Sequence, residues 1–238
     1  MHALKTRLLS SWQKAGWNEI AFLGGIMAFC LSVWLFLAVA GAVAHESFHE
    51  VEVRWMQALR NPADLSDLAG PWWVEELARD ISALGSAVVV VMLSVFVTGF
   101  LLLRRYWGRA ALVTVTVLGG YLLSGALKSN YARARPDVVP HLAEVSSASF
   151  PSGHSMASSL VYLTLGALLA QTMPRRREKI YVLMAAATVT GLIGVSRVAL
   201  GVHYPTDVLA GWSAGTAWAL ACLLIAWKWR SRRAGISH

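Results

Sequence analysis

The sequence contains 238 residues, 56% of them hydrophobic, and its mean hydropathy is +0.53. Charged residues make up 14% of the chain, well below the roughly 25% that is usual in soluble domains. This composition excludes an ordinary water-soluble globular protein and predicts a membrane protein. The formal net charge of +8 resembles that of a nucleic-acid-binding protein, but the placement of the basic residues, described below, fits a membrane protein, and we expect no nucleic-acid partner.

Six apolar segments reach or approach the roughly 20 residues that a helix needs to cross a bilayer. They are residues 20–44, 81–103, 110–127, 155–173, 180–195 and 208–227. The fifth is short, because Arg197 makes its extension costly. We therefore predict an all-α fold, a bundle of six transmembrane helices that forms a single domain over residues 1–238.

The first apolar segment has a second interpretation. Basic residues precede it, and "AVAGAVAHE" offers the small-residue pattern of a signal-peptide cleavage site. Its uncharged run covers 25 residues, however, whereas the apolar part of a signal peptide has about 7–15. We expect the first helix to be retained.

The basic residues mark every second connection. Fourteen of the 21 lie before the first segment, between segments two and three, between four and five, or after the sixth: Lys5, Arg7, Lys14, Arg104, Arg105, Arg109, Arg175, Arg176, Arg177, Lys179, Lys228, Arg230, Arg232 and Arg233. The positive-inside rule places these parts and both termini in the cytoplasm. We expect an integral protein of a bacterial cytoplasmic (inner) membrane, with the other connections on the outer, periplasmic side.

The first outer connection, residues 45–80, contains eight acidic residues. Within it, "FHEVEVRWMQAL" and "GPWWVEELARDI" carry apolar residues at helical spacing. We predict an amphipathic helical segment lying on the outer surface between helices one and two, with a structural rather than a catalytic role.

Three motifs at the outer helix ends carry the residues suited to chemistry. The first, "KSNYARARP", supplies Lys128 and, seven residues later, Arg135. A lysine and an arginine together favour an anionic ligand, because the guanidinium group matches phosphate oxygens in pairs. Taken alone, they are more often the basic end of a helix that reaches for the membrane surface. Arg133 lies between these two residues in the sequence.

The second motif, "PSGH", supplies Ser152, Gly153 and His154 at the start of the fourth apolar segment. The free backbone N–H groups at a helix N-terminus form an anion-binding site, and a glycine lets a ligand approach the backbone closely. The alternative for Ser152 is an N-cap without a ligand.

The third motif, "SRVALGVHYPTD", supplies Ser196, Arg197, His203 and Asp207. A carboxylate four residues after a histidine can fix the tautomer of the imidazole and stabilise its cation, although such a pair alone is more often a capping arrangement. Together the three motifs bring to one side of the membrane the cations, the nucleophile and the acid that phosphoryl transfer requires.

The spacings K-x6-R-P at 128–136, P-S-G-H at 151–154 and S-R-x5-H-x3-D at 196–207 resemble the three-part signature of the type 2 phosphatidic acid phosphatase superfamily. All three match without a departure and in the family's order, over residues 128–207. The resemblance extends, through the six-helix plan, to most of the chain.

The resemblance implies a mechanism and a set of roles. His203 is the expected nucleophile, forming a phosphohistidine; Asp207 orients it, and His154 protonates the leaving oxygen and then activates water. The expected phosphate-binding residues are Lys128, Arg135, Ser152, Gly153 and Arg197, with Pro136 and Ser196 in support. The family needs no metal or other cofactor, and we see no spare carboxylate cluster of the kind that binds magnesium.

The expected substrate is a phosphomonoester or diphosphate of a membrane lipid, and the bilayer is the expected environment, with no obligatory protein partner. Undecaprenyl diphosphate is our first choice, since its hydrolysis recycles a carrier lipid outside the cytoplasm. Phosphatidylglycerol phosphate, phosphatidic acid, diacylglycerol pyrophosphate and lipid A phosphates remain open, as does phosphate transfer to another lipid.

Two other classes fit less well. The superfamily also resembles vanadate-dependent haloperoxidases, but those are soluble. An anion or lipid transporter would place its charges near the bilayer midplane in broken helices, whereas these charges lie at helix ends on one side.

Overall fold

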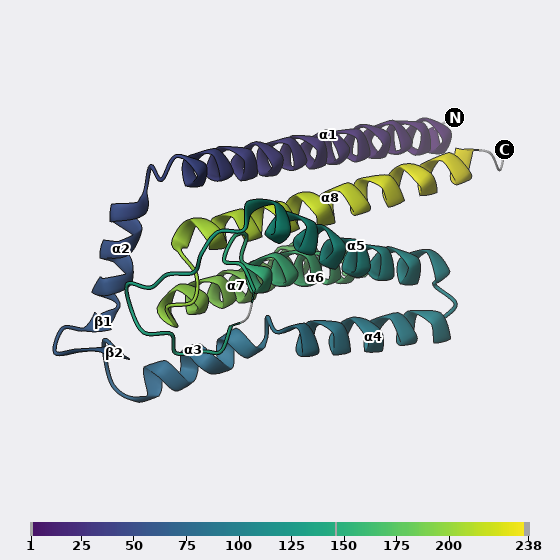
Figure 1. Cartoon of the computed structure of the whole chain (residues 1–238). Coiled ribbons are helices and arrows are strands. Elements are labelled where there is room, and N and C mark those ends of the chain that lie inside the picture. The colour runs from purple at the N-terminus through teal and green to yellow at the C-terminus, as the bar shows by residue number, and fades with distance from the viewer. Residues whose placement is uncertain (1, 146, 236–238) are drawn as a thin grey trace.

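We analysed a computed structural model of the chain, which describes residues 2–145 and 147–235, with side chains described over 19–145 and 147–231. In these residues the fold comprises eight helices and a single two-stranded sheet (Figure 1). The side chains of Lys5, Arg7, Lys14, Arg232 and Arg233, which we used to orient the bundle, lie outside the described residues.

The elements follow each other in a simple order. They are α1 (His2–Ala44), α2 (His49–Ala58), β1 (Arg60–Asn61), β2 (Asp64–Leu68), α3 (Trp73–Ala83), α4 (Ala87–Leu103), α5 (Trp107–Tyr131), α6 (Gly153–Ala170), α7 (Arg176–Ala199) and α8 (Pro205–Gly235). Each predicted apolar segment overlaps a long helix, and the second, 81–103, also includes the end of α3. Most of these helices extend beyond the apolar segment, because a helical backbone continues through the polar residues at the membrane surface.

Five helices in the described residues are long and apolar enough to cross a membrane: α1 from Glu19, α5, α6, α7 and α8 up to Ser231. A sixth span results if α3 and α4 count as one helix bent by 44°. The bend falls inside the predicted segment 81–103. At Ser86 the backbone is extended, and its Oγ accepts a hydrogen bond from the Val89 N–H at 3.3 Å, which starts α4 as a separate helix. The predicted all-α transmembrane bundle is confirmed, with its second span bent.

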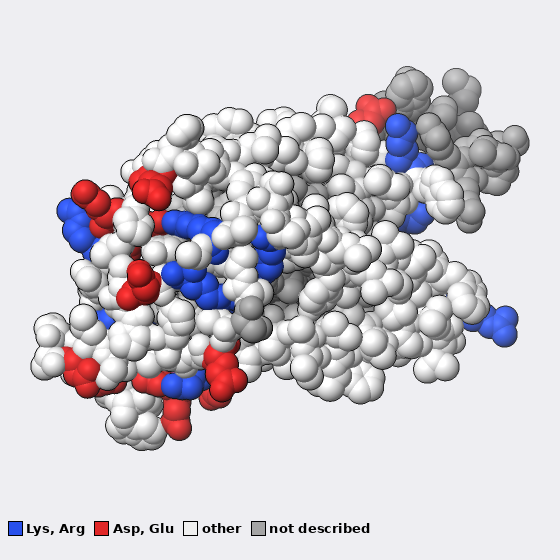
Figure 2. All heavy atoms as spheres, in the orientation of Figure 1, with Lys and Arg blue, Asp and Glu red and all other residues white. Residues whose placement is uncertain are grey.

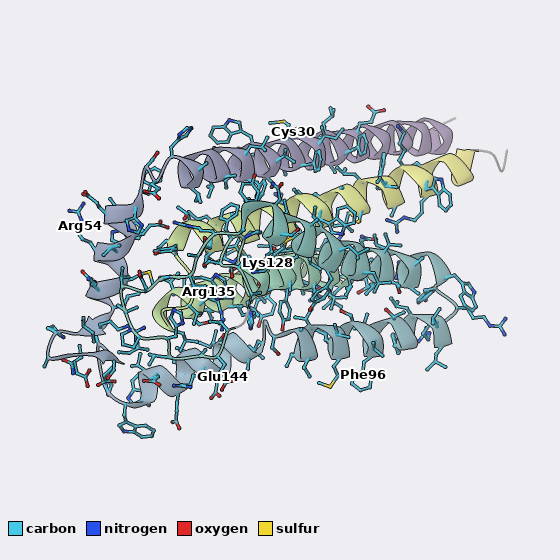
Figure 3. The ribbon with its side chains drawn as sticks, viewed as in Figure 1. Cys30, Arg54, Phe96, Lys128, Arg135 and Glu144 are labelled. Carbon is cyan, nitrogen blue, oxygen red and sulfur yellow. The ribbon has the colours of Figure 1, made fainter. Side chains whose placement is uncertain are left out.

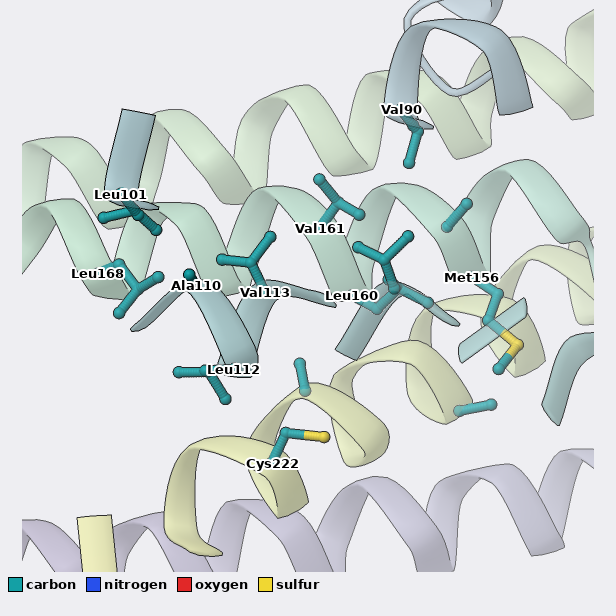
Figure 4. Close-up of a cluster of buried hydrophobic side chains, with 14 residues drawn as sticks. Val90, Leu101, Ala110, Leu112, Val113, Met156, Leu160, Val161, Leu168 and Cys222 are labelled. Carbon is teal, nitrogen blue, oxygen red and sulfur yellow. The ribbon is translucent and has the colours of Figure 1, made fainter. Parts of the chain in front are cut away.

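Helix α6 lies at the centre of the bundle, and 11 of its 18 residues are buried. It contacts α4, α5, α7 and α8, and α1 packs along α8 on the outside (Figure 1). The main apolar cluster joins α4, α5, α6 and α8 and includes Val113, Met156, Leu160 and Cys222 (Figure 4). The central position of α6 fixes its N-terminus, which carries "PSGH", among the ends of its neighbours.

The contact between α6 and α8 depends on small residues. A Cβ atom at Gly211 would lie 2.6 Å from the Ser152 carbonyl oxygen, and one at Gly215 would lie 2.5 Å from the Met156 carbonyl oxygen. Such small residues allow two membrane helices to approach until their backbones touch. The two glycines thereby set the distance between the start of α6 and the start of α8.

The outer connection forms a layer at the end of the bundle opposite the chain termini, where α2, the β1–β2 hairpin and α3 gather (Figure 1). The two amphipathic helices predicted from residues 48–59 and 70–81 are confirmed as α2 and α3. The hairpin between them was not predicted. Its strands have only two and five residues, and the second, "DLSDL", is mostly exposed. A strand this short and exposed does not need the alternation of apolar and polar residues by which a strand is predicted from sequence.

We predict that Gly215→Ala destabilises the protein, because the added methyl group meets the backbone of α6. Overpacking of this kind costs about 1–3 kcal/mol, which thermal unfolding in detergent detects as a lower midpoint temperature. Gly99→Ala in α4 is the matched control, since a Cβ atom there has no neighbour within 4 Å. Equal midpoints for the two variants would contradict the assigned close contact.

Candidate active site

The three motifs meet at the end of the bundle that carries α2 and α3. This end of the bundle contains the end of α5, residues 132–145 and 147–152, the start of α6, the end of α7 and the start of α8. Side-chain sticks show Lys128 and Arg135 lying among the helices, whereas Arg54 of α2 points outward (Figure 3). In the space-filling view, charged side chains gather at the two ends of the molecule and leave the middle uncharged (Figure 2).

His203 lies in the short loop between α7 and α8 and is only 1% exposed. Its Nδ1 is 3.6 Å from Oδ2 of Asp207, which is slightly too far for a hydrogen bond. The Ser149 hydroxyl lies beside both groups: it donates to Asp207 Oδ2 at 2.5 Å and is 3.3 Å from His203 Nδ1. The histidine and the carboxylate are thus brought together as expected, with a serine that the sequence did not single out.

Burial lowers the pKa of the His203 imidazole to about 4, against the attraction of Asp207 and together with the repulsion of Arg135 and Arg197. The imidazole is therefore neutral at pH 7, and a neutral imidazole has the lone pair that a nucleophile needs.

Arg135 is held by two backbone carbonyl groups, and one of them belongs to Val202, the residue before His203. The Arg135 Nε donates to the Ser147 carbonyl oxygen at 2.8 Å and its Nη1 to the Val202 carbonyl oxygen at 2.7 Å. The same Nη1 lies 3.4 Å from His203 Nε2. Burial lowers the pKa of Arg135, partly against the attraction of Asp207, yet a guanidinium group remains charged in proteins. A cation is thus fixed beside the nitrogen that faces away from Asp207.

The start of α6 is held against both α5 and α8. The Ser152 N–H donates to the Asp207 carbonyl oxygen at 2.9 Å, and the Ser152 hydroxyl caps its own helix, accepting from the Ser155 N–H at 3.4 Å. The Lys128 ammonium group donates to the Ala148 carbonyl oxygen. A Cβ atom at Gly153 would lie 3.5 Å from Lys128 Cε, so the glycine leaves the space between the lysine and the helix N-terminus open.

His154 is half-buried in the first turn of α6. It lies close enough to interact electrostatically with Arg197, His203, Arg135 and Lys128. The two histidines therefore belong to one cluster, which contains all of the expected cations.

Arg197 is buried in the last turn of α7. Its Nη1 donates to the Ser82 hydroxyl of α3 at 2.7 Å, and its buried Nε has no hydrogen-bond partner in the described residues. The neighbouring Ser196 donates to the Ile193 carbonyl oxygen of its own helix at 2.7 Å. Pro136 is buried, and its carbonyl oxygen lies 2.6 Å from Nε2 of His141. Ser196 and Pro136 thus support the backbone.

Arg133 does not face the expected phosphate site. Its Nη1 donates to Asp207 Oδ1 at 2.7 Å and to Thr206 Oγ1 at 2.8 Å, and its Nη2 donates to Glu52 Oε2 at 3.0 Å. Burial alone would lower the pKa of Arg133, but Asp207 and Glu52 outweigh that effect and raise it. Arg133 is therefore a half-buried link between α8 and the outer segment.

The outer segment contributes more than a covering layer. Glu52 of α2 is 3% exposed, and its Oε1 accepts from the Thr206 N–H at 2.9 Å and the Thr206 hydroxyl at 2.6 Å. A carboxylate at this position caps α8 and suits the positive end of its dipole. Glu52 and Ser82 thus hold the residues behind the cluster. Sequence reasoning missed both, because each is one polar residue among many in residues 45–86.

An apolar cavity of about 300 Å³ leads away from the cluster between α4, α5 and α6. Lys128 and His154 lie at its polar part, and its apolar wall includes Tyr121, Met156 and Leu160. Within the described residues, no group of three or more histidine, cysteine, aspartate or glutamate residues is arranged to hold a metal ion.

The comparisons with known proteins agree with this geometry. Residues 108–231 match the sequence profile of the PAP2 superfamily. The chain is 33% identical over 194 residues to phosphatidylglycerophosphatase B of Bacillus subtilis (strain 168), covering 78% of this chain and 88% of that protein. It is 28% identical over 178 residues to a lipid A 1-phosphatase of Rhizobium etli, covering 65% of this chain and 72% of that protein.

A solved structure shares the fold as well. The crystal structure of a transmembrane PAP2 type phosphatidylglycerolphosphate phosphatase from Bacillus subtilis matches with a TM-score of 0.72 at 31% identity, over 84% of this chain and 96% of that one. The family expected from the three motifs is confirmed: the chain belongs to the PAP2 superfamily, as a membrane-integrated lipid phosphatase.

Proposed function

We propose that the protein removes phosphate from a membrane lipid through a phosphohistidine at His203, with residues 1–238 acting as a single domain. The observation that carries this proposal is the setting of the imidazole. Nε2 lies 3.4 Å from the Arg135 guanidinium group, and Nδ1 lies on the side of Ser149 and Asp207. A phosphate held by Arg135 would lie next to a neutral imidazole nitrogen.

In the first step, the Nε2 lone pair of His203 forms a bond to phosphorus, and the bond from phosphorus to the lipid oxygen breaks. The leaving oxygen keeps the electron pair and takes a proton from His154. Lys128, Arg135 and Arg197 bind the charged equatorial oxygens, as cations do in phosphoryl transfer. Ser152 and the Gly153 N–H add the dipole of the α6 N-terminus.

In the second step, neutral His154 accepts a proton from water, and the water oxygen bonds to phosphorus. The bond from Nε2 to phosphorus breaks, its electron pair returns to His203, and inorganic phosphate leaves. Asp207 stays ionised and stabilises the imidazolium charge in both steps. Ser196 and Pro136 support the backbone around Arg197 and Arg135. All of these groups come from the chain, so we expect no cofactor and no metal ion.

Two lipids are the leading candidates. The phosphatidylglycerophosphatase B relative and the solved phosphatidylglycerolphosphate phosphatase favour phosphatidylglycerol phosphate. The charge pattern of the connections supports a site on the outer face of a bacterial cytoplasmic membrane, with the termini inside. A site in that location favours undecaprenyl diphosphate. Three cations and a helix N-terminus suit either a monoester or a diphosphate, and the apolar cavity beside Lys128 suits the lipid chain.

We predict phosphate release in EDTA by the purified protein in detergent, tested on five lipids: phosphatidylglycerol phosphate, undecaprenyl diphosphate, phosphatidic acid, diacylglycerol pyrophosphate and lipid A. We expect the highest kcat/KM with one of the two leading candidates. His203→Ala serves as the blank. Transfer of phosphate to an added lipid without release would indicate a phosphotransferase, and activity that requires magnesium would contradict the mechanism.

We predict that wild-type protein, mixed with radiolabelled substrate and quenched in alkali, carries label on His203. Phosphohistidine survives alkali, whereas a carboxyl phosphate does not, and peptide mapping locates the label. His203→Ala should bind no label and should lose kcat by at least about 1,000-fold, because the covalent route is gone. A label that persists in this variant would assign the nucleophile elsewhere.

The pKa of His203 predicts where the rate of phosphoenzyme formation falls in acid. The nucleophile is the neutral imidazole, so the rate falls as the pH drops through its pKa of about 4, more than two units below the ordinary value of about 6.5. Rapid-quench bursts between pH 3.5 and 8 measure this inflection, with the substrate phosphate titrated separately by phosphorus NMR. An inflection near 6.5 that the substrate does not explain would show that burial fails to keep His203 neutral.

A further inference from the structure

We propose that Ser149 is a positioning residue that holds His203 in the tautomer with the proton on Nδ1, by linking that nitrogen to Asp207. The inference rests on the proposed function, in which Nε2 of His203 is the nucleophile. Ser149 lies outside the three sequence motifs, two residues before Pro151.

The distances place the hydroxyl between the two groups. Ser149 Oγ is 2.5 Å from Asp207 Oδ2 and 3.3 Å from His203 Nδ1, while Nδ1 and Oδ2 are 3.6 Å apart. The 3.6 Å separation of Nδ1 and Oδ2 is beyond hydrogen-bonding distance, whereas the 3.3 Å separation of Nδ1 and Oγ is that of a long hydrogen bond. Each contact made through the serine is therefore shorter than the direct one.

The donors and acceptors around the serine leave one arrangement. An ionised carboxylate only accepts, and Asp207 is kept ionised by Arg133 Nη1 at 2.7 Å and the Tyr204 N–H at 2.9 Å from its two oxygens. The Ser149 proton must then point to Asp207, which leaves an oxygen lone pair facing Nδ1. A proton on Nδ1 satisfies that lone pair.

The other side of the ring requires the same tautomer. Arg135 Nη1 lies 3.4 Å from Nε2, and a guanidinium group only donates. A proton on Nε2 would oppose it, whereas a lone pair on Nε2 accepts from it. Ser149 and Arg135 thus select the same form of His203 from opposite sides, and this form carries the nucleophilic lone pair toward the phosphate site.

The hydroxyl is held rigidly enough for this role. Ser149 is fully buried, and its N–H donates to the Arg133 carbonyl oxygen at 2.9 Å. The next residue, Phe150, is also fully buried and packs against Tyr131 with ring centroids 4.8 Å apart. The two residues before Ser149 also hold cations: the Ser147 carbonyl oxygen accepts from Arg135, and the Ala148 carbonyl oxygen accepts from Lys128. Residues 147–149 therefore contact the His203 imidazole and hold two of the expected phosphate-binding cations, Arg135 and Lys128.

The experiment compares Ser149→Ala with the matched control Ser213→Ala. Ser213 is a buried serine of α8 whose hydroxyl donates only within its own helix. We measure kcat, KM, inhibition by inorganic phosphate, and nitrogen NMR of protein labelled only at its seven histidines, with His203→Gln identifying the signal. Thermal unfolding shows that each variant is folded.

We expect wild-type His203 to show a protonated Nδ1 and an unprotonated Nε2. In Ser149→Ala we expect a mixture of tautomers and a kcat lower by about 10- to 100-fold, the range for removal of a group that orients a reacting one. KM and the inhibition constant for phosphate should stay within about twofold, because the cations remain. Ser213→Ala should match the wild type in all four measurements.

A Ser149→Ala protein that keeps its kcat within twofold, or keeps the single Nδ1-protonated tautomer, would overturn the role of Ser149. A proton on Nε2 in the wild type would overturn it as well. The proposed function fails separately, if the wild type forms no phosphohistidine at His203. In that case the NMR comparison still decides whether Ser149 controls the imidazole.

Discussion

The structure depends on the burial of one ionised carboxylate, that of Asp207, at the end of an apolar bundle. A buried charge is tolerated only when hydrogen-bond donors surround it. Asp207 receives hydrogen bonds from Arg133, Ser149 and the Tyr204 N–H, so the loop after α5, the segment before α6 and the start of α8 must all converge on it. The requirement to satisfy this group therefore brings distant parts of the chain to one place.

The same requirement extends to the outer segment. Arg133 is itself half-buried, and its Nη2 donates to Glu52, which in turn caps α8 through Thr206. Ser82 of α3 occupies one nitrogen of Arg197 in the same way. Helices α2 and α3 thus cover one side of the polar cluster, and the apolar core of the bundle lies on its other side. This arrangement supplies partners for the charged groups at the end of an apolar bundle.

The two nitrogens of the His203 ring therefore have different surroundings. The side toward Asp207 has a fixed donor and acceptor pattern, and the side toward Arg135 has only donors. In the mechanism that we propose, burial keeps the ring neutral, and its contacts decide which nitrogen carries the proton. The glycines at 211 and 215 support this geometry at a distance, since they let α8 approach α6 closely enough for the Ser152 N–H to reach the Asp207 carbonyl oxygen.

The sequence by itself determined the membrane-spanning fold, the family and the residues of the three motifs, because apolar length and motif spacing are local properties of a chain. It also placed α2 and α3. It did not show the bend at Ser86, the β1–β2 hairpin or the roles of Ser149, Glu52 and Ser82. Ser149 and Ser82 are serines outside the three motifs, and Glu52 is one of eight acidic residues in its segment. No motif sets them apart from other polar residues of the chain. Only the tertiary structure decided their partners, because a buried charge is satisfied by whichever donors the packing of distant helices brings within about 3 Å.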